Sequence, residues 1–168
     1  MSNVILIGYM GCGKSTVGKR LSFRLKMPYV DTDKWIETKQ ETTISEIFAM
    51  KGEAAFREME TECVKCLFEN KQDYVIAVGG GLPIREENRV LLKKLGKVVY
   101  LRAKPDTIYE RLKEDVTRPL LQGEDPYGKI CAMIKQRGPI YEVTADCVID
   151  VDGKNFEEII SEIEEAVS

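Results

Sequence analysis

The residues with the clearest chemistry in this chain form a glycine-rich segment near its N-terminus. Residues 8–15, Gly-Tyr-Met-Gly-Cys-Gly-Lys-Ser, match the pattern G-x-x-x-x-G-K-[ST] and follow an apolar run at 4–7. The apolar run predicts a buried strand, and residues 14–25 predict the helix that this pattern requires after it. The glycines let backbone N–H groups point inward, and the helix N-terminus adds a positive dipole end. The segment predicts a binding loop for a nucleoside triphosphate, in preference to a glycine-rich turn without a ligand.

Individual residues of this loop have separate tasks. Lys14 can reach the β- and γ-phosphates, and the Ser15 hydroxyl is placed to ligate Mg²⁺, which we predict as the cofactor. Cys12 lies at a helix N-terminus, where the pKa of a thiol tends to fall, so redox sensitivity of the loop is a hypothesis that alkylation of Cys12 would test. The predicted nucleotide-binding residues are Gly11, Cys12, Gly13, Lys14, Ser15 and Thr16.

Two carboxylates, Asp31 and Asp33, lie at the end of a second short strand predicted at 28–31. This is the sheet edge at which α/β proteins bind ligands, and residues two apart on an extended segment point the same way. One carboxylate could hold Mg²⁺ through water while the other binds a hydroxyl of a substrate. The alternative is that one of them caps the next helix.

Two further motifs carry groups that suit a polar substrate. Arg57 and Glu60 lie one turn apart on a predicted helix, where a surface ion pair is the simpler interpretation of the two residues alone. The triglycine segment 79–81 follows the apolar run 74–78, so it would expose backbone N–H groups and let a ligand approach closely. A flexible turn is the alternative for this segment.

Two arginines lie in the C-terminal half of the chain. Arg118 belongs to the polar stretch 115–125, which we expect to be a mobile loop between two helices, and Arg137 follows in Gln-Arg-Gly-Pro-Ile-Tyr. An arginine on a lid can close over a transferring phosphoryl group and stabilise its charge. Taken singly, each arginine is more often a solvated surface charge.

Composition restricts the kinds of protein that fit. The 168 residues, 43% apolar and 32% charged, suit one domain over 1–168, without a membrane span or a targeting signal, so we expect a cytoplasmic protein. A net charge of −3 argues against nucleic acid as a partner. Five scattered cysteines suit reduced thiols, and Cys63-x-x-Cys66 is half of a zinc pattern without a second half.

Histidine is absent from the chain, which excludes Ser–His and Cys–His nucleophilic catalysis. Phosphoryl transfer does not need an imidazole base, because it rests on positioning and electrostatic stabilisation. A kinase is therefore compatible with this composition.

The elements that must position these residues alternate along the chain. Continuously apolar runs predict parallel strands covered on both faces, and helical patterns fill the intervals between them, which indicates an α/β doubly wound sheet. The predicted strands are 3–7, 28–31, 74–78, 97–101 and 147–151. The predicted helices are 15–26, 33–40, 44–50, 52–70, 85–95, 105–114, 125–142 and 156–167.

The ordered set of motifs resembles the shikimate kinase family. The set is GYMGCGKST, VDTD, ISEIF, FREME, GGG, RPLL and RGPIY, and the likeness runs from residue 4 to about 150. The resemblance implies a P-loop fold like that of nucleoside monophosphate kinases, with a five-stranded parallel sheet flanked by helices, substrate-binding helices at about 33–60 and a mobile lid at about 113–125. It also implies a monomer that transfers the ATP γ-phosphate to the 3-hydroxyl of shikimate.

The same resemblance implies roles for single residues. Lys14, Asp33 and Arg118 would be catalytic, with Asp33 taking the proton from the attacking hydroxyl, and Ser15 and Asp31 would serve the metal. Arg57 and Arg137 would hold the shikimate carboxylate, with Glu60 orienting Arg57. The substrate pocket would be lined by Gly79, Gly80 and Gly81, and Arg111 would stack on adenine. The loop 152–156 lacks the proline expected from some relatives, so the residue covering the second face of adenine stays open.

Two alternatives differ in kind. A gluconate or nucleoside monophosphate kinase would need a similar loop, but it would not be expected to combine FREME, GGG and RPLL in one chain. A non-catalytic nucleotide switch predicts damage to at least one of five residues, and all five are intact: Lys14, Ser15, Asp31, Asp33 and Arg118.

Overall fold

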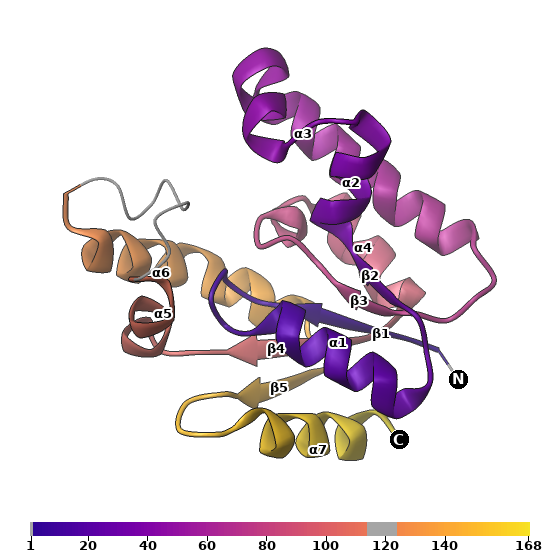
Figure 1. Ribbon diagram of the computed structural model, residues 1–168, viewed down its shortest axis with the longest axis vertical. Coiled ribbons are helices and arrows are strands. Elements are labelled where there is room, and N and C mark those ends of the chain that lie inside the picture. Colours follow the sequence, from indigo (N-terminus) through magenta and orange to yellow (C-terminus); the bar gives the residue numbers. More distant parts are fainter. Residues whose placement is uncertain (1, 114–123) are drawn as a thin grey trace.

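A five-stranded parallel sheet forms the centre of the computed structural model, which describes residues 2–113 and 124–168 (Figure 1). Every neighbouring pair of strands is parallel, so all the strands end at one edge of the sheet. The strands are β1 (Asn3–Ile7), β2 (Tyr29–Asp31), β3 (Val75–Ala77), β4 (Gly96–Arg102) and β5 (Cys147–Asp150), in the spatial order β2-β3-β1-β4-β5.

The central position of β1 decides where a ligand can bind. The first connection leads from β1 to one side of the sheet, towards β2, and the later strands β4 and β5 lie on its other side. Ligands of open α/β sheets bind beyond the carboxyl ends of the strands where the order reverses in this way. The loop after β1, which carries the phosphate-binding pattern, lies at this place.

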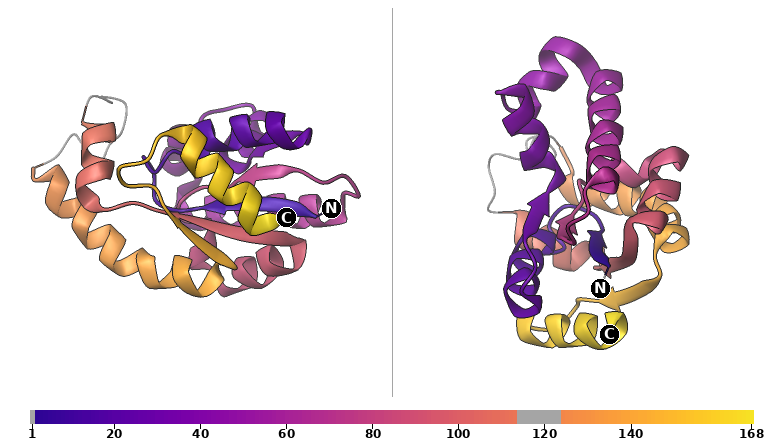
Figure 2. Two further views of the ribbon diagram at one scale, coloured as in Figure 1. Left: turned by 90° about the horizontal axis from the view of Figure 1, so that it is seen from below. Right: turned by 90° about the vertical axis from the view of Figure 1, so that its right-hand side faces the viewer.

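Helices cover both faces of the sheet, as the left view in Figure 2 shows. One face carries α1 (Lys14–Leu25) and α7 (Phe156–Val167), which contact each other. The opposite face carries α4 (Glu86–Leu95) and α6 (Pro126–Thr144). Because both faces are covered, β1 is buried along its whole length, which explains its continuously apolar sequence.

Two helices stand away from the sheet at one end of the molecule (Figure 1). They are α2 (Thr32–Gln40) and α3 (Ile44–Glu69), which pack against each other. Gly52 interrupts α3 with φ 85° and ψ 172°, a conformation that essentially only glycine adopts. The expected separate helices 44–50 and 52–70 are thus the two halves of one kinked element.

Most predicted elements are confirmed within one or two residues. The sequence reasoning missed the short 3₁₀ helix η1 (Leu82–Ile84), which begins directly after the triglycine segment. Helix α5 (Pro105–Leu112) ends at the border of the predicted lid at about 113–125, and residues 114–123 of that lid lie outside the described part of the chain. No described helix combines the length and the apolar character needed to cross a membrane.

Candidate active site

The loop between β1 and α1 has the backbone conformation that phosphate binding requires. Gly8, Gly11 and Gly13 have φ values of 147°, 80° and 97°, so each occupies a region that side-chain-bearing residues rarely adopt. The Cys12 N–H donates to the Tyr9 carbonyl at 3.3 Å, which closes the turn. The Lys14 ammonium group folds back onto the loop and donates to the carbonyls of Gly8 and Tyr9. The ammonium cation of Lys14 is therefore held against the backbone of the phosphate loop.

One cavity of about 380 Å³ joins this loop to the other predicted motifs. Its walls come from the phosphate loop, α2, α3, the triglycine segment and α6. Twelve predicted site residues line it: Gly11, Gly13, Lys14, Ser15, Thr16, Asp31, Asp33, Arg57, Gly79, Gly80, Gly81 and Arg137. Segments that are far apart in sequence thus contribute to one site, as their common sheet edge predicts.

Three predicted residues do not line this cavity in the described structure. Arg118 lies outside the described residues. The Cys12 side chain is 1% exposed and packs in the core, so its thiol offers almost no surface to a redox reagent. Arg111 lies on α5 beside the phosphate loop, where its guanidinium group donates to the Gly11 carbonyl at 3.4 Å.

Asp31 caps a helix, as one of the two alternatives expected, and it also lines the cavity. It is the N-cap of α2, and its Oδ1 accepts the N–H groups of Asp33 at 2.9 Å and Lys34 at 3.2 Å. It also lines the cavity, as does Ser15. Because both capping bonds use Oδ1, Oδ2 remains for the cavity. Hydroxyl and carboxylate oxygens are the donors that Mg²⁺ prefers, so these two residues fit that ion.

Asp33 reaches the cavity in a different way from the one predicted. The expectation of two carboxylates on one extended segment was wrong, because β2 ends at Asp31 and Asp33 already belongs to the first turn of α2. In this position Asp33 approaches the triglycine segment: a β-carbon placed on Gly79 would lie 2.6 Å from Asp33 Oδ1. A glycine is therefore required at 79 to make room for the carboxylate.

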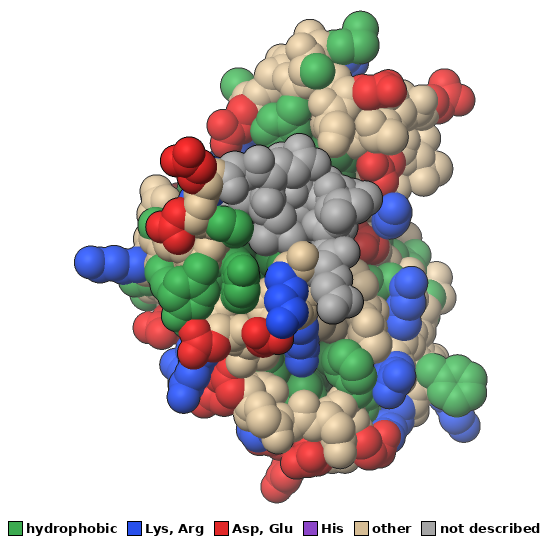
Figure 3. Space-filling model, turned by 60° about the vertical axis from the view of Figure 1, so that its left-hand side comes forward, with side chains coloured by type: hydrophobic (Ala, Val, Ile, Leu, Met, Phe, Trp, Pro, Cys, Tyr) green, Lys and Arg blue, Asp and Glu red, His purple; other side chains and the backbone are tan. Residues whose placement is uncertain are grey.

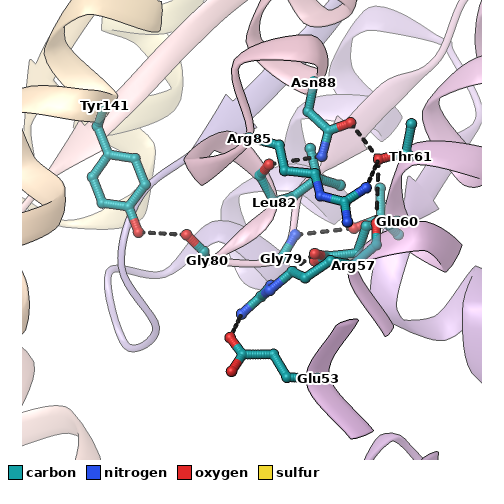
Figure 4. A network of polar contacts seen from close by, with 11 residues as sticks. Glu53, Arg57, Glu60, Thr61, Gly79, Gly80, Leu82, Arg85, Asn88 and Tyr141 are labelled. Carbon is teal, nitrogen blue, oxygen red and sulfur yellow. Dashed lines mark hydrogen bonds and ion pairs between the residues drawn. The ribbon is translucent and has the colours of Figure 1, made fainter. Parts of the chain in front are cut away.

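Arg57 and Glu60 form a buried ion pair in the wall of the cavity (Figure 4). Arg57 Nη1 donates to Glu60 Oε1 at 2.7 Å, and Nη2 donates to Glu53 at 3.3 Å. Glu60 is 1% exposed, so the interpretation as a surface pair does not apply. Burial raises the pKa of Glu60 to about 7, against the lowering effect of Arg57. Burial opposes the charge of Arg57, but its carboxylate partners raise its pKa above the ordinary value.

The triglycine segment contacts each of the three charged groups in turn. A β-carbon on Gly79 would meet Asp33, one on Gly80 would lie 3.5 Å from Arg137 Nη1, and one on Gly81 would lie 2.6 Å from Arg57 Nη2. Three consecutive residues without side chains thus let one carboxylate and two guanidinium groups converge. Among the described residues, the N–H groups of Gly80 and Gly81 have no hydrogen-bond partner. These two donors remain available to a ligand.

Arg137 completes this group from α6. Its guanidinium carbon lies 5.9 Å from the centre of the Tyr9 ring, in the phosphate loop. Arg57 and Arg137 therefore face the cavity from different helices, while Asp33 lies at the N-terminus of a third. Two planar cations suit the bidentate binding of a carboxylate, and one carboxylate suits a hydroxyl donor.

Sequence reasoning did not find Phe156 beside Arg111. The Arg111 guanidinium carbon lies 5.7 Å from the centre of the Phe156 ring, and that of Arg20 lies 5.0 Å from it. A β-carbon on Gly13 would meet both Arg111 and Phe156, at 2.8 and 3.3 Å. An aromatic ring and a guanidinium plane thus lie side by side at the outer end of the phosphate loop. The family resemblance implied that the loop 152–156 lies near adenine, but it left open which residue covers the second face.

The comparisons with known proteins agree on one family. The family described as shikimate kinase matches residues 10–168. A shikimate kinase of Thermodesulfovibrio yellowstonii is 44% identical over 163 residues, which are 97% of this chain and 93% of the relative. The structure of shikimate kinase from Acinetobacter baumannii in complex with shikimate is similar with a TM-score of 0.92 at 36% identity, over 99% of this chain and 93% of that one.

A gluconokinase gives a much weaker likeness. The structure of the enzyme from Sinorhizobium meliloti has a TM-score of 0.58 at 17% identity, over 99% of this chain and 91% of that one. This similarity shows a common fold alone. The sugar-acid kinase alternative therefore gains no support beyond the fold.

Proposed function

The chain belongs to the shikimate kinase family, and we propose that the cavity described above is where it transfers the γ-phosphate of ATP to the 3-hydroxyl of shikimate. The protein is an ATP-dependent kinase that forms shikimate 3-phosphate and ADP in the biosynthesis of aromatic amino acids.

Shikimate is a small ring with one carboxylate and three hydroxyls, and the charges of the cavity match this pattern. Arg57 and Arg137 bind the carboxylate, and Glu60 orients the Arg57 guanidinium group through their 2.7 Å hydrogen bond. Gly79, Gly80 and Gly81 lie against the ring, with the N–H groups of the last two as donors. Asp33 accepts hydrogen bonds from the hydroxyls at the other end. Arginine suits the carboxylate better than lysine because its planar fork binds both oxygens.

Catalysis then needs few further groups. Asp33 takes the proton of the attacking hydroxyl, and Lys14 stabilises the negative charge on the transferred phosphoryl group. Arg118, from the lid at about 113–125, adds a second cation over the same group. Because the cavity holds the hydroxyl and the γ-phosphate in line, most of the rate enhancement comes from positioning.

We assign the binding of Mg²⁺ and of ATP to residues in and around the phosphate loop. Ser15 and Asp31 would hold Mg²⁺, Asp31 through water, and the ion would supply positive charge that neutralises the phosphates. Gly11, Cys12, Gly13 and Thr16 contribute backbone or hydroxyl donors to the phosphates. Arg111 stacks on one face of adenine, and Phe156, 5.7 Å from it, is the neighbouring group that can cover the other face.

The remaining expectations concern the whole chain. We propose a monomer, with the nucleotide and substrate parts in one kinase domain and the acceptor-binding helices at about 33–60. The convergence of Asp33, Arg57 and Arg137 on one triglycine segment supports this, because one chain supplies the complete acceptor site. The unpaired state of all five cysteines fits a reducing compartment such as the cytoplasm.

The single observation that carries the proposal is the shared cavity of Lys14 and Ser15 with Asp33, Arg57 and Arg137. The test is a coupled ADP assay with ATP, Mg²⁺ and a panel of acceptors: shikimate, quinate, gluconate and nucleoside monophosphates. We expect shikimate to give the highest kcat/KM by a wide margin. A preference for gluconate or a nucleotide would overturn the assignment of the acceptor.

A further inference from the structure

Two buried hydroxyl groups hold the triglycine segment from different sides. Thr32 is 0% exposed, and its Oγ1 accepts the Gly79 N–H at 2.9 Å. Tyr141 is 1% exposed, and its hydroxyl donates to the Gly80 carbonyl at 2.6 Å. Figure 4 shows Tyr141 approaching Gly80 from α6, away from the Arg57 and Glu60 side of the segment. Neither hydroxyl has a task in the reaction proposed above.

The triglycine segment depends on such bonds because it has no side chains of its own. Its other hydrogen bonds in the described part of the chain are local: the Leu82 N–H donates to the Gly79 carbonyl and the Ile84 N–H to the Gly81 carbonyl, both at 3.1 Å. Those bonds form the turn into η1 and connect to no other element. The bonds from Thr32 and Tyr141 are therefore what ties the segment to α2 and α6.

Each hydroxyl lies next to a charged group of the acceptor site. Thr32 directly precedes Asp33 at the start of α2, and Tyr141 lies one turn after Arg137 on α6. The Tyr141 ring packs against Tyr100 of β4 with ring centres 5.1 Å apart, which fixes the side chain. Burial raises the pKa of Tyr141 above its ordinary value, so the phenol keeps its proton and stays a donor at neutral pH.

We propose that Thr32 and Tyr141 are positioning residues for the binding of shikimate. They hold the triglycine segment in a fixed position relative to Asp33 and Arg137. The inference rests on the proposed function, because it assigns these residues to the acceptor half of that site. The segment can place its free N–H groups correctly only while the hydrogen bonds to Thr32 and Tyr141 are both formed. Loss of either hydrogen bond should therefore weaken the binding of shikimate and leave the binding of ATP unchanged.

The test removes each hydroxyl with the least change in shape. Tyr141→Phe keeps the ring against Tyr100, and Thr32→Val keeps the volume of the side chain but leaves the Gly79 N–H unpaired. We expect each variant to raise the KM for shikimate roughly three- to tenfold, as the loss of one buried hydrogen bond implies. The KM for ATP should stay within about twofold of wild type, since the bonds described for the two hydroxyls join them to the triglycine segment and not to the phosphate loop.

Two further variants separate positioning from a general loss of stability. Thr32→Ser keeps the acceptor oxygen and should return the KM for shikimate to near the wild-type value. Thr144→Val is the matched control, because Thr144 is another buried threonine, on α6, whose hydroxyl donates only to the Ile140 carbonyl of its own helix at 2.7 Å. It should change neither KM.

The outcomes distinguish this inference from the function on which it rests. Wild-type enzyme without shikimate-dependent ADP release would contradict the function itself. Normal wild-type activity, with an unchanged KM for shikimate in both Thr32→Val and Tyr141→Phe, would overturn the positioning role alone, whatever their melting temperatures. An equal rise in the KM for shikimate and for ATP would also overturn it. If one variant does not fold, the other decides.

Discussion

At the scale of single residues, Glu60 is the least ordinary group of the site. It is almost fully buried beside the cavity proposed to bind shikimate, and its pKa is raised from 4.5 to about 7 by burial. Protonated or ionised, it can accept the hydrogen bond from Arg57 through a carboxyl oxygen, so the orientation of Arg57 survives titration. What changes with pH is the negative charge that faces the shikimate carboxylate across the guanidinium group.

This arrangement predicts a pH-dependent affinity. A bound carboxylate favours neutral Glu60, so the binding of shikimate and the protonation of Glu60 favour each other. The KM for shikimate should therefore rise as the pH increases through about 7. The rise should be up to tenfold for each unit by which the substrate raises the pKa of Glu60. Glu60→Gln is neutral at every pH and should give a flat profile between pH 6 and 8.5. Steady-state kinetics check this, and a KM that falls with pH would contradict it.

The raised pKa of Glu60 also makes the free energy of unfolding depend on pH. The folded chain holds the Glu60 proton more tightly than the unfolded chain, in which the pKa is ordinary. Its contribution to the free energy of unfolding is therefore complete below about pH 4.5 and is lost as the pH rises through about 7. Thermal unfolding of wild type and Glu60→Gln across this window separates the contribution from those of other groups.

Asp33 carries the proton transfer in this account. Asp33→Asn keeps the size of the side chain but cannot take a proton, so kcat should fall about 10²-fold or more. ADP binding, measured by calorimetry, should stay unchanged because the phosphate loop is intact. A turnover near that of wild type would show that Asp33 only binds the substrate.

Arg57 is one of the two arginines proposed to bind the shikimate carboxylate. Arg57→Ala should cost shikimate affinity on the order of 2–4 kcal/mol, because a carboxylate would be buried without its partner. Arg57→Lys should recover only part of this, since an ammonium group cannot bind both oxygens. Arg85→Ala is the control: it removes an ion pair of the same 2.7 Å length, to Glu58, outside the cavity. An unchanged KM in Arg57→Ala would return Arg57 to a structural role.

At the scale of elements, helix starts and kinks decide where these side chains lie. The sequence predicted a helix near Asp33, but the residue at which β2 ends and α2 begins depends on the Asp31 capping bonds. Period-two reasoning therefore predicted that both carboxylates reach the cavity, which they do, but for a wrong geometric reason. The Arg57–Glu60 pair shows the same limit: helical spacing predicts that they meet, and only packing against the triglycine segment decides that they are buried.

The kink in α3 gives a prediction about stability. Gly52 has an essentially glycine-only conformation, and a β-carbon there would meet nothing within 4 Å, so any penalty comes from the backbone alone. Gly52→Ala should lower the free energy of unfolding by about 1–3 kcal/mol. Lys51→Ala, at the preceding exposed position, is the control and should be nearly neutral. Equal stability of both variants in urea unfolding would contradict a strained backbone at 52.

At the scale of the whole molecule, the parallel sheet brings the site together. Its strand order places β3 between β2 and β1, so the segments that follow these three strands meet at one edge of the sheet. These segments carry Asp31 and Asp33, the triglycine segment and Lys14, which line one cavity. This much could be predicted, because alternating apolar runs and helices fix a doubly wound sheet. Contacts that depend on tertiary packing could not, such as those of Thr32, Tyr141 and Phe156.

The surface adds little to this account of function. On the face drawn in Figure 3, acidic and basic side chains are interspersed over the described elements. This distribution agrees with the small net charge of −3. Charged side chains are arranged in a clear pattern inside the cavity. Arg57 and Arg137 line it together with Asp31 and Asp33.

The central claim is that one cavity brings the γ-phosphate of ATP to the 3-hydroxyl of shikimate. The most direct measurement is ADP formation with Mg²⁺ and ATP as shikimate is varied, with the product examined by phosphorus and proton NMR. The account predicts almost no ADP without shikimate, and one phosphate ester, at the 3-hydroxyl, for each ADP formed. ADP release that does not depend on shikimate, or an ester at another hydroxyl, would contradict it.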